Sequence, residues 1–193
     1  MTEIVDFAVA PGAIDGLVVV TPKQVTDERG TIREVFRRSA FESAGIDIGA
    51  FGQINATTST RGVIRGMHAE SMTKLVTVVA GEAFGAYRDL RSDSPTFLTQ
   101  DTVRLVPGVQ VLVPHGVANG FQAVSAECHY VYCFDREWEP GMPGVAFTPI
   151  DPDHEIPWPV EIDPDDPSLL SVKDRNATRL DDLRASLATH HGG

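Results

Sequence analysis

The chain has 193 residues, with 13 prolines, 17 glycines and a formal net charge of -11 at neutral pH. This length is enough for one domain whose hydrophobic core needs no disulfide or metal for stability. Nucleic acids and anionic membranes bind proteins through a basic surface, so the negative charge argues against both as the main partner. An anionic ligand would have to meet a local cluster of arginine and lysine side chains.

Segments rich in Val, Ile, Thr and Phe, many turn residues and few amphipathic helical windows predict a mainly β protein, a barrel or a sandwich. No stretch reaches the roughly 20 apolar residues of a membrane span, and the N-terminus lacks the basic region and apolar run of a signal peptide. We therefore expect a soluble, cytoplasmic protein. Cys128 and Cys133 suit a reducing compartment, and in one predicted strand they should face opposite sides and form no disulfide with each other.

The elements follow in chain order, and turn residues separate them. A short helix is predicted over residues 37–45, with Ser39 as N-cap and Gly45 as C-cap. The strands are predicted near residues 17–20, 31–36, 53–59, 103–105, 109–113, 121–124 and 129–134, with two more inside 74–91 that are joined at Gly81-Glu82.

Prolines dominate residues 139–168 and break up regular structure there. Because Phe147 and Trp158 lie inside this segment, we expect it to wrap against the barrel rather than to be disordered. A short helix is expected at about residues 181–188, followed by a frayed tail. The whole chain, residues 1–193, is predicted to form one domain.

Polar residues alternate along one predicted strand, at Gln53, Asn55, Thr57 and Ser59. This period of two puts all four side chains on one face, which either lines a cavity or belongs to an exposed edge strand. The stretch 61–70 follows directly and combines two arginines with a histidine and a glutamate. We expect the functional site of the protein in this region.

The sequence gives little support for a metal site. Three or four neutral nitrogen or oxygen ligands would have to converge, and the nearest approach to a His-x-His pair is His68-x-Glu70. His115 and His129 lie far along the chain. We therefore predict no metal.

Acid-base chemistry fits the residue types better, because the usual motifs of nucleophilic catalysis and glycine-rich phosphate loops are missing. Phosphates would be bound by arginine side chains. A histidine on a cavity-lining strand suits proton transfer near neutral pH. Strict alternation puts His68 and Arg65 on opposite faces unless Gly66 carries a β-bulge. Tyr130 and Tyr132 share a face of a later strand.

Several sequence blocks match a known family in their order along nearly the whole chain. By these blocks the chain resembles the dTDP-4-dehydrorhamnose 3,5-epimerase family, whose members have a cupin-type jelly-roll β-barrel with short peripheral helices. The blocks are Asp27-Glu28-Arg29-Gly30 with Glu34 and Phe36, Gln53-x-Asn55, Arg61-Gly62-Val63-Ile64-Arg65-Gly66-Met67-His68, Gly81-Glu82-x-Phe84, Asp89-Leu90-Arg91, Pro114-x-Gly116-x-Ala118-x-Gly120-Phe121, Tyr132, Trp158-Pro159 and Leu170-Ser171-x-Lys173-Asp174.

The resemblance implies an isomerase that inverts C3, C5 or both of a dTDP-4-keto-6-deoxyhexose through an enolate. His68 occupies the position of the base and Asp174 that of its carboxylate partner. Tyr132 occupies the position of the acid on the opposite face of the sugar. Lys74 matches the lysine near the C4 oxygen. No cofactor is implied, because the ketone of the substrate is the electron sink.

The resemblance also implies the binding residues and the assembly. Arg29 and Arg65 match the arginines that bind the diphosphate, and Glu34, Gln53 and Asn55 match polar residues that contact the sugar and the nucleotide. The family forms homodimers in which N-terminal strands cross between subunits. Arg29 would then serve the neighbouring site.

Four positions depart from the family pattern. Asn119 stands where the family usually has a histidine, Glu70 where it has a glutamine and Gly85 where it has an aspartate. Trp138 stands where a tyrosine often stacks on the base. Asn119 and Gly85 motivate one alternative, a mono-epimerase acting on a different nucleotide sugar. A second alternative, from a different class, is a non-catalytic nucleotide-sugar binding protein on the same barrel.

Overall fold

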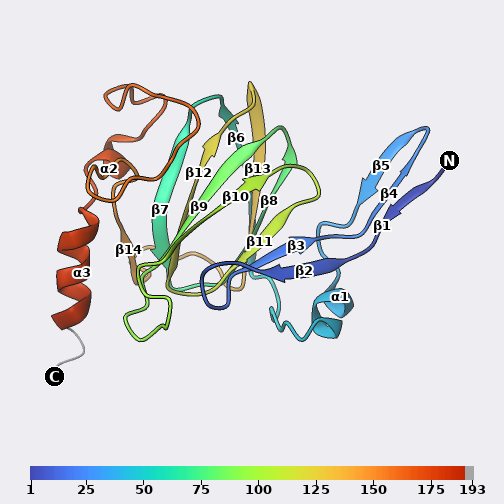
Figure 1. Cartoon of the computed structure of the whole chain (residues 1–193), viewed down its shortest axis with the longest axis horizontal. Helices are drawn as coiled ribbons and strands as arrows, with labels where there is room; N and C mark the ends of the chain where they lie inside the picture. The colour runs from blue at the N-terminus through green and yellow to red at the C-terminus, as the bar shows by residue number, and fades with distance from the viewer. Residues whose placement is uncertain (190–193) are drawn as a thin grey trace.

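The computed structural model describes residues 1–189 (Figure 1). The helices are α1 (Arg38–Ser43), α2 (Val172–Arg175) and α3 (Leu180–Thr189). None of these helices is long and apolar enough to cross a membrane. The strands are β1 (Glu3–Val5), β2 (Ala8–Pro11), β3 (Val18–Thr21), β4 (Gln24–Asp27), β5 (Gly30–Arg33), β6 (Gln53–Thr60), β7 (Ile64–Glu70), β8 (Lys74–Ala80), β9 (Ala83–Asp89), β10 (Gln100–Leu105), β11 (Gln110–Val113), β12 (Val117–Ala123), β13 (Glu127–Phe134) and β14 (Gly144–Ala146).

These strands form two larger sheets and one small one. The five-stranded sheet has the order β10-β9-β12-β7-β14, and the six-stranded sheet has the order β2-β3-β11-β8-β13-β6. Their strand pairs are antiparallel. The third sheet, β1-β4-β5, extends away from the other two at the right of Figure 1.

Side chains on the facing sides of the two larger sheets form the central core. Val76 and Val78 of β8 are buried there, as are Val117 and Phe121 of β12. Phe121 stacks on Tyr130 of the other sheet, with ring centroids 4.0 Å apart. Because side chains alternate along a strand, strands such as β8 and β13 give alternate residues to this core. The arrangement confirms the predicted mainly β, cupin-type jelly-roll fold.

The outer face of the six-stranded sheet is covered by α1 and its flanking loops. Leu75 of β8 and Leu112 of β11 belong to a buried cluster with Phe41 of α1. Phe36 lies between Phe41 and Phe51, with ring centroids 5.3 Å and 4.7 Å away. Such aromatic contacts fix the loops on either side of the helix.

The outer face of the five-stranded sheet is covered by the C-terminal part of the chain. Phe147, inside the proline-rich segment 139–168, and Leu180 of α3 are buried in a cluster with Met67 of β7. Figure 1 shows α3 in red at the side of this sheet. The helix spans residues 180–189, close to the predicted 181–188.

The start of α1 differs from the prediction. Arg37 is the N-cap, with the extended backbone angles of that position and no capping hydrogen bond from its side chain, so the prediction of Ser39 is wrong. Ser39 lies inside the helix. Gly45, just beyond the helix end, has a φ of 75°. The C-cap is Ala44, so the prediction of Gly45 at that position is wrong by one residue. Gly45 follows the cap and adopts this left-handed conformation without steric cost.

The strand predicted over residues 31–36 is shorter in the structure. It is β5, which ends at Arg33. The chain leaves the strand there because Phe36 turns toward the aromatic cluster on α1.

Both cysteines are buried and unpaired in β13. Cys128 belongs to the central core and Cys133 to the cluster around α1. They therefore face opposite sides of the sheet, as predicted.

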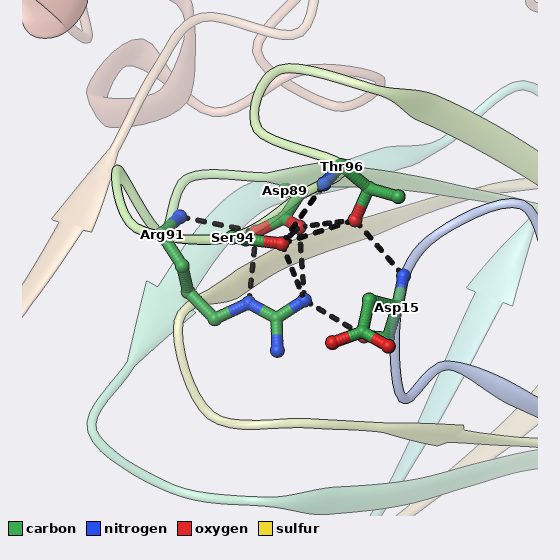
Figure 2. A network of polar contacts seen from close by, with 5 residues as sticks. All are labelled: Asp15, Asp89, Arg91, Ser94 and Thr96. Atoms are coloured by element: carbon green, nitrogen blue, oxygen red, sulfur yellow. Dashed lines mark hydrogen bonds and ion pairs between the residues drawn. The ribbon is translucent and has the colours of Figure 1, made fainter.

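Asp89, at the end of β9, anchors the loop that leads to β10 (Figure 2). It is fully buried, and its carboxylate accepts hydrogen bonds from Arg91 Nε at 2.8 Å, Ser94 Oγ at 2.6 Å and Thr96 Oγ1 at 2.7 Å. Arg91 Nη2 also donates to the backbone oxygen of Asp15 at 2.7 Å. Burial raises the pKa of Asp89, but these hydrogen bonds outweigh it and lower the pKa to about 2.

We predict that Asp89→Asn lowers the free energy of unfolding by about 2 kcal/mol near neutral pH. Because the pKa is lowered in the folded protein, this stabilisation is present above about pH 4 and is lost as the pH falls toward 2. Urea unfolding at a series of pH values measures it. Asp93→Asn, in the same loop, is the control and should leave the midpoint unchanged. Equal midpoints for Asp89→Asn and wild type at pH 7 would contradict the prediction.

Candidate active site

A cavity of about 140 Å³ lies between the two larger sheets. Both sheets contribute polar side chains to it, whereas the central core beside it is apolar. The residues that line it are Asn55 and Thr57 of β6, Arg65, His68 and Glu70 of β7, Lys74 of β8, Asn119 of β12, and Tyr132 and Phe134 of β13.

The polar face of β6 forms one wall of this cavity. Asn55 and Thr57 line it, and Ser59 Oγ accepts a hydrogen bond from Arg65 Nε at 3.1 Å. The same strand is the edge of its sheet, and Ile54 on its other face is 62% exposed. The polar face of β6 therefore lines the cavity, although β6 is also an edge strand.

A β-bulge in β7 brings Arg65 and His68 to the same wall. Asn119 pairs with His68 while Phe121 pairs with Arg65, so two residues of β7 oppose one residue of β12. Gly66 lies in the bulge with a φ of 133°, and a Cβ at this position would be 2.5 Å from a Cα of β12. Only glycine fits this close approach. The bulge that the sequence allowed at Gly66 is thus present.

His68 and Asp174 form a hydrogen-bonded pair at the cavity. Nε2 of His68 is 2.7 Å from Oδ1 of Asp174, which lies on α2. Ser171 caps α2, because its Oγ accepts a hydrogen bond from the Asp174 backbone N–H at 3.0 Å. Burial raises the pKa of Asp174, but the hydrogen bond from His68 and other contacts lower it overall. A carboxylate in this position fixes the ring and leaves Nδ1 as the nitrogen that can take up a proton.

Tyr132 faces the cavity from the other sheet. Its ring lies against Tyr130, with centroids 4.7 Å apart, and stacks on Phe134 at 5.7 Å. Burial raises the pKa of Tyr132, although the charge of Arg65 acts in the opposite direction. The hydroxyl therefore keeps its proton at neutral pH and can act as a proton donor.

Lys74 provides a buried cation on the same side of the cavity. Its Nζ donates to Asn119 Oδ1 at 2.7 Å, to the backbone oxygen of His68 at 3.3 Å and to the Glu70 carboxylate. Burial lowers the pKa of Lys74, and the charge of Glu70 opposes this only in part. Burial raises the pKa of Glu70, but Lys74 and further contacts lower it overall.

Two residues predicted to bind substrate lie outside the cavity. Arg29 is on the β4–β5 hairpin, where its Nη2 is 2.6 Å from Asp27 Oδ2, and Figure 1 shows this hairpin extending away from the larger sheets. Glu34 pairs with Arg37 and lines a different pocket, on the outer side of β8. Within one chain, neither side chain joins the group around His68.

Two more predicted binding residues lie next to the cavity without lining it. Gln53 Nε2 donates to Asn55 Oδ1 at 3.0 Å, and Gln53 Oε1 accepts from the Trp138 backbone N–H at 2.8 Å. Trp138 is 54% exposed. The structure therefore links both residues to the cavity wall through Asn55.

Three residues that line the cavity were not predicted as site residues: Thr57, Glu70 and Phe134. The alternation of side chains along each strand could have identified all three. Thr57 alternates with Asn55, Glu70 shares a face with His68, and Phe134 follows Tyr132 by two positions.

The three other histidines that the structure describes do not form a metal site. His129 pairs with Glu127 at 2.6 Å, His154 pairs with Asp181 at 2.9 Å, and His115 is exposed in a turn. Within residues 1–189, no group of three or more His, Cys, Asp or Glu side chains is arranged to hold a metal ion.

The family match, the similar proteins and the similar solved structure all indicate the same family. Residues 11–182 match the family described as dTDP-4-dehydrorhamnose 3,5-epimerase. The dTDP-4-dehydrorhamnose 3,5-epimerase of Methanothermobacter thermautotrophicus is 36% identical over 180 residues, which cover 89% of this chain and 93% of that protein. The dTDP-4-dehydrorhamnose 3-epimerase of Streptomyces niveus is 33% identical over 181 residues, with coverages of 90% and 84%. The crystal structure of NovW, a 4-keto-6-deoxy sugar epimerase from the novobiocin biosynthetic gene cluster of Streptomyces spheroides, has a TM-score of 0.86 at 30% identity and covers 95% of this chain and 92% of its own.

The matched region contains every residue that lines the cavity, together with Asp174. The likeness to NovW covers nearly the whole chain, including both larger sheets. The chain therefore belongs to the dTDP-4-dehydrorhamnose 3,5-epimerase family and is an isomerase.

Proposed function

We propose that the chain epimerises a dTDP-linked 4-keto-6-deoxyhexose at C3, C5 or both, through an enolate and without a cofactor. The ketone at C4 acidifies the hydrogens on both neighbouring carbons, so inversion needs a base on one face of the sugar and an acid on the other. The main support is the position of His68 and Tyr132, which face one cavity from opposite sheets.

In the proposed reaction, His68 removes the proton from the carbon next to the ketone, and its ring is held by Asp174. The electron pair of the broken C–H bond moves toward the C4 oxygen and forms the enolate. Lys74 stabilises the negative charge that develops there. Tyr132 then donates its proton to the same carbon from the other face, which inverts the centre.

The nucleotide part of the substrate requires a second set of contacts. Arg65, which Ser59 orients, would bind the diphosphate in the bidentate manner usual for arginine. Gln53 and Asn55 would contact the sugar or the nucleotide. The exposed indole of Trp138 offers a flat surface for the base. Asn119 contributes an amide at the inner end of the site.

Arg29 and Glu34 would act in a homodimer. The hairpin that contains Arg29 extends from the body of the chain, and the neighbouring N-terminal segments contain exposed Ile4 and Ile32. We propose that these strands cross to a second copy, so that Arg29 completes the diphosphate site of the neighbour.

The direct experiment is incubation with dTDP-4-keto-6-deoxyglucose in deuterated water, followed by NMR at C3 and C5. Label at both carbons supports double epimerisation. Label at one carbon supports the mono-epimerase alternative, which the departure at Asn119 and the similarity to a 3-epimerase favour. Binding of dTDP with no label would instead support a non-catalytic binding protein.

We predict that His68→Asn reduces deuterium incorporation by about 100-fold or more, because an amide cannot act as the base. The fold should be retained, since His68 lies in the cavity and not in the core. His129→Asn is the matched control and should keep full activity, because His129 contacts Glu127 outside the cavity. Undiminished exchange in His68→Asn would refute the proposed base.

For Tyr132→Phe we predict that deuterium exchange and formation of the epimer fall by different amounts. The base remains, so the proton can still be removed and a deuteron returned from the same side, whereas inversion loses its acid. Formation of epimer should fall by about tenfold or more, with a smaller loss of exchange. Tyr130→Phe on the same strand is the control. Equal losses of exchange and inversion would contradict an acid role for Tyr132.

A mixing experiment tests the crossed dimer. We predict that inactive Arg29→Ala and inactive His68→Asn chains, unfolded together and refolded at equal amounts, regain about a quarter of the wild-type activity. Half of the dimers would be mixed, and each mixed dimer has one site with both native residues only if Arg29 comes from the neighbour. No recovery in a sample that is dimeric by light scattering would contradict the exchange.

A further inference from the structure

The ammonium group of Lys74 has no free donor in the cavity. A lysine has three N–H groups, and Nζ of Lys74 has three acceptors: the carboxylate of Glu70, Oδ1 of Asn119 and the backbone oxygen of His68. The contact with the backbone oxygen of His68 is the longest of the three, at 3.3 Å against 2.7 Å for Oδ1 of Asn119. A ligand oxygen would therefore compete first for that donor.

Glu70 is the acid in direct contact with this ammonium group. The titratable side chains that line the cavity are Arg65, His68, Glu70 and Tyr132 besides Lys74 itself, from strands β7, β8 and β13. Asp174, on α2, is bonded to His68. Arg65 is a like charge and Tyr132 is neutral at physiological pH, so Glu70 supplies the opposing charge.

The Lys74 side chain is only 4% exposed, and a buried ammonium without a partner tends to lose its proton. Asn119 lies on β12 and is 4% exposed, so its amide is a fixed acceptor. The two partners thus have different effects: the negative charge of Glu70 stabilises the charged ammonium group of Lys74, and Asn119 fixes the orientation of that group.

We propose that Glu70 is a positioning residue that keeps Lys74 cationic, while Asn119 directs the ammonium group so that its third donor is offered to the substrate oxygen. The part that concerns the substrate rests on the proposed function, in which Lys74 faces the developing enolate. The charge state of Lys74 does not depend on that function and can be measured without substrate.

The chain has only three lysines, Lys23, Lys74 and Lys173, which makes the measurement direct. Labelled lysine gives three side-chain NMR signals, and Lys23→Arg and Lys173→Arg assign Lys74 by elimination. In Glu70→Gln, which keeps the shape of the side chain, we expect Lys74 to titrate at lower pH than in wild type. Glu82→Gln, whose native carboxylate pairs with Arg104, is the control and should leave Lys74 unchanged.

Moving the carboxylate from position 70 to position 119 tests whether Glu70 acts through its charge or only through its shape. In the double variant Glu70→Gln with Asn119→Asp, a carboxylate again lies beside Nζ, and the titration of Lys74 should return toward the wild-type value. Asn119→Asp alone should raise it, which keeps the proposal testable if Glu70→Gln does not fold. An unchanged titration in Glu70→Gln, or no recovery in the double variant, would overturn the proposal.

Activity gives the second readout. The alkaline limb of kcat/KM should move to lower pH in Glu70→Gln and return in the double variant, with a loss of about tenfold in Glu70→Gln above the new midpoint. A shifted titration without a shifted pH profile would reject the catalytic part of the proposal. Failure of the proposed function itself would appear separately, as exchange that survives His68→Asn.

Discussion

The close approach of β7 and β12 at Gly66 is the constraint on which the candidate site depends. The bulge at this glycine turns both Arg65 and His68 toward the cavity, which regular alternation would prevent. The Gly66 backbone also hydrogen-bonds to Asp174 and helps to keep that carboxylate ionised. One backbone position thus aligns an arginine, a histidine and the partner of the histidine. A side chain at residue 66 would collide with β12 and disturb all three.

The interior of the sandwich changes gradually from a packed core to a polar cavity. Phe121, Tyr130, Tyr132 and Phe134 form a continuous row of ring contacts, from the fully buried Phe121 to the cavity wall. The rigid aromatic row holds the Tyr132 hydroxyl without help from a hydrogen-bonding partner on its own strand. The same aromatic side chains therefore pack the core and position Tyr132, the candidate acid.

Local patterns predicted those parts of the structure that depend on alternation and on glycine. The opposite orientation of the two cysteines of β13 followed from a period of two. The same period put the polar side chains of β6 on one face but left open whether that face lines a cavity, and Gly66 indicated only where a bulge could lie. The N-cap of α1 was wrong because the cap at Arg37 uses backbone geometry without a side-chain signal. Strands β1 and β14 are short and are stabilised by pairing with β4 and β7, which lie outside a local sequence window. The ion pair of Glu70 with Lys74 was not predicted, because strand alternation indicates which side of the sheet a side chain faces but not which residue it contacts.

Asp174 contacts His68 although the two are 106 positions apart in the sequence, and it lies within the C-terminal segment that covers the five-stranded sheet. Two short elements there, α2 and the bridge of Leu170 to Ile64, help to hold this carboxylate against β7. Local opening of such a covering segment costs less free energy than global unfolding. The orientation of His68, the proposed base, therefore depends on how firmly the C-terminal segment is docked. A chain whose barrel is fully folded can still lack a correctly oriented histidine.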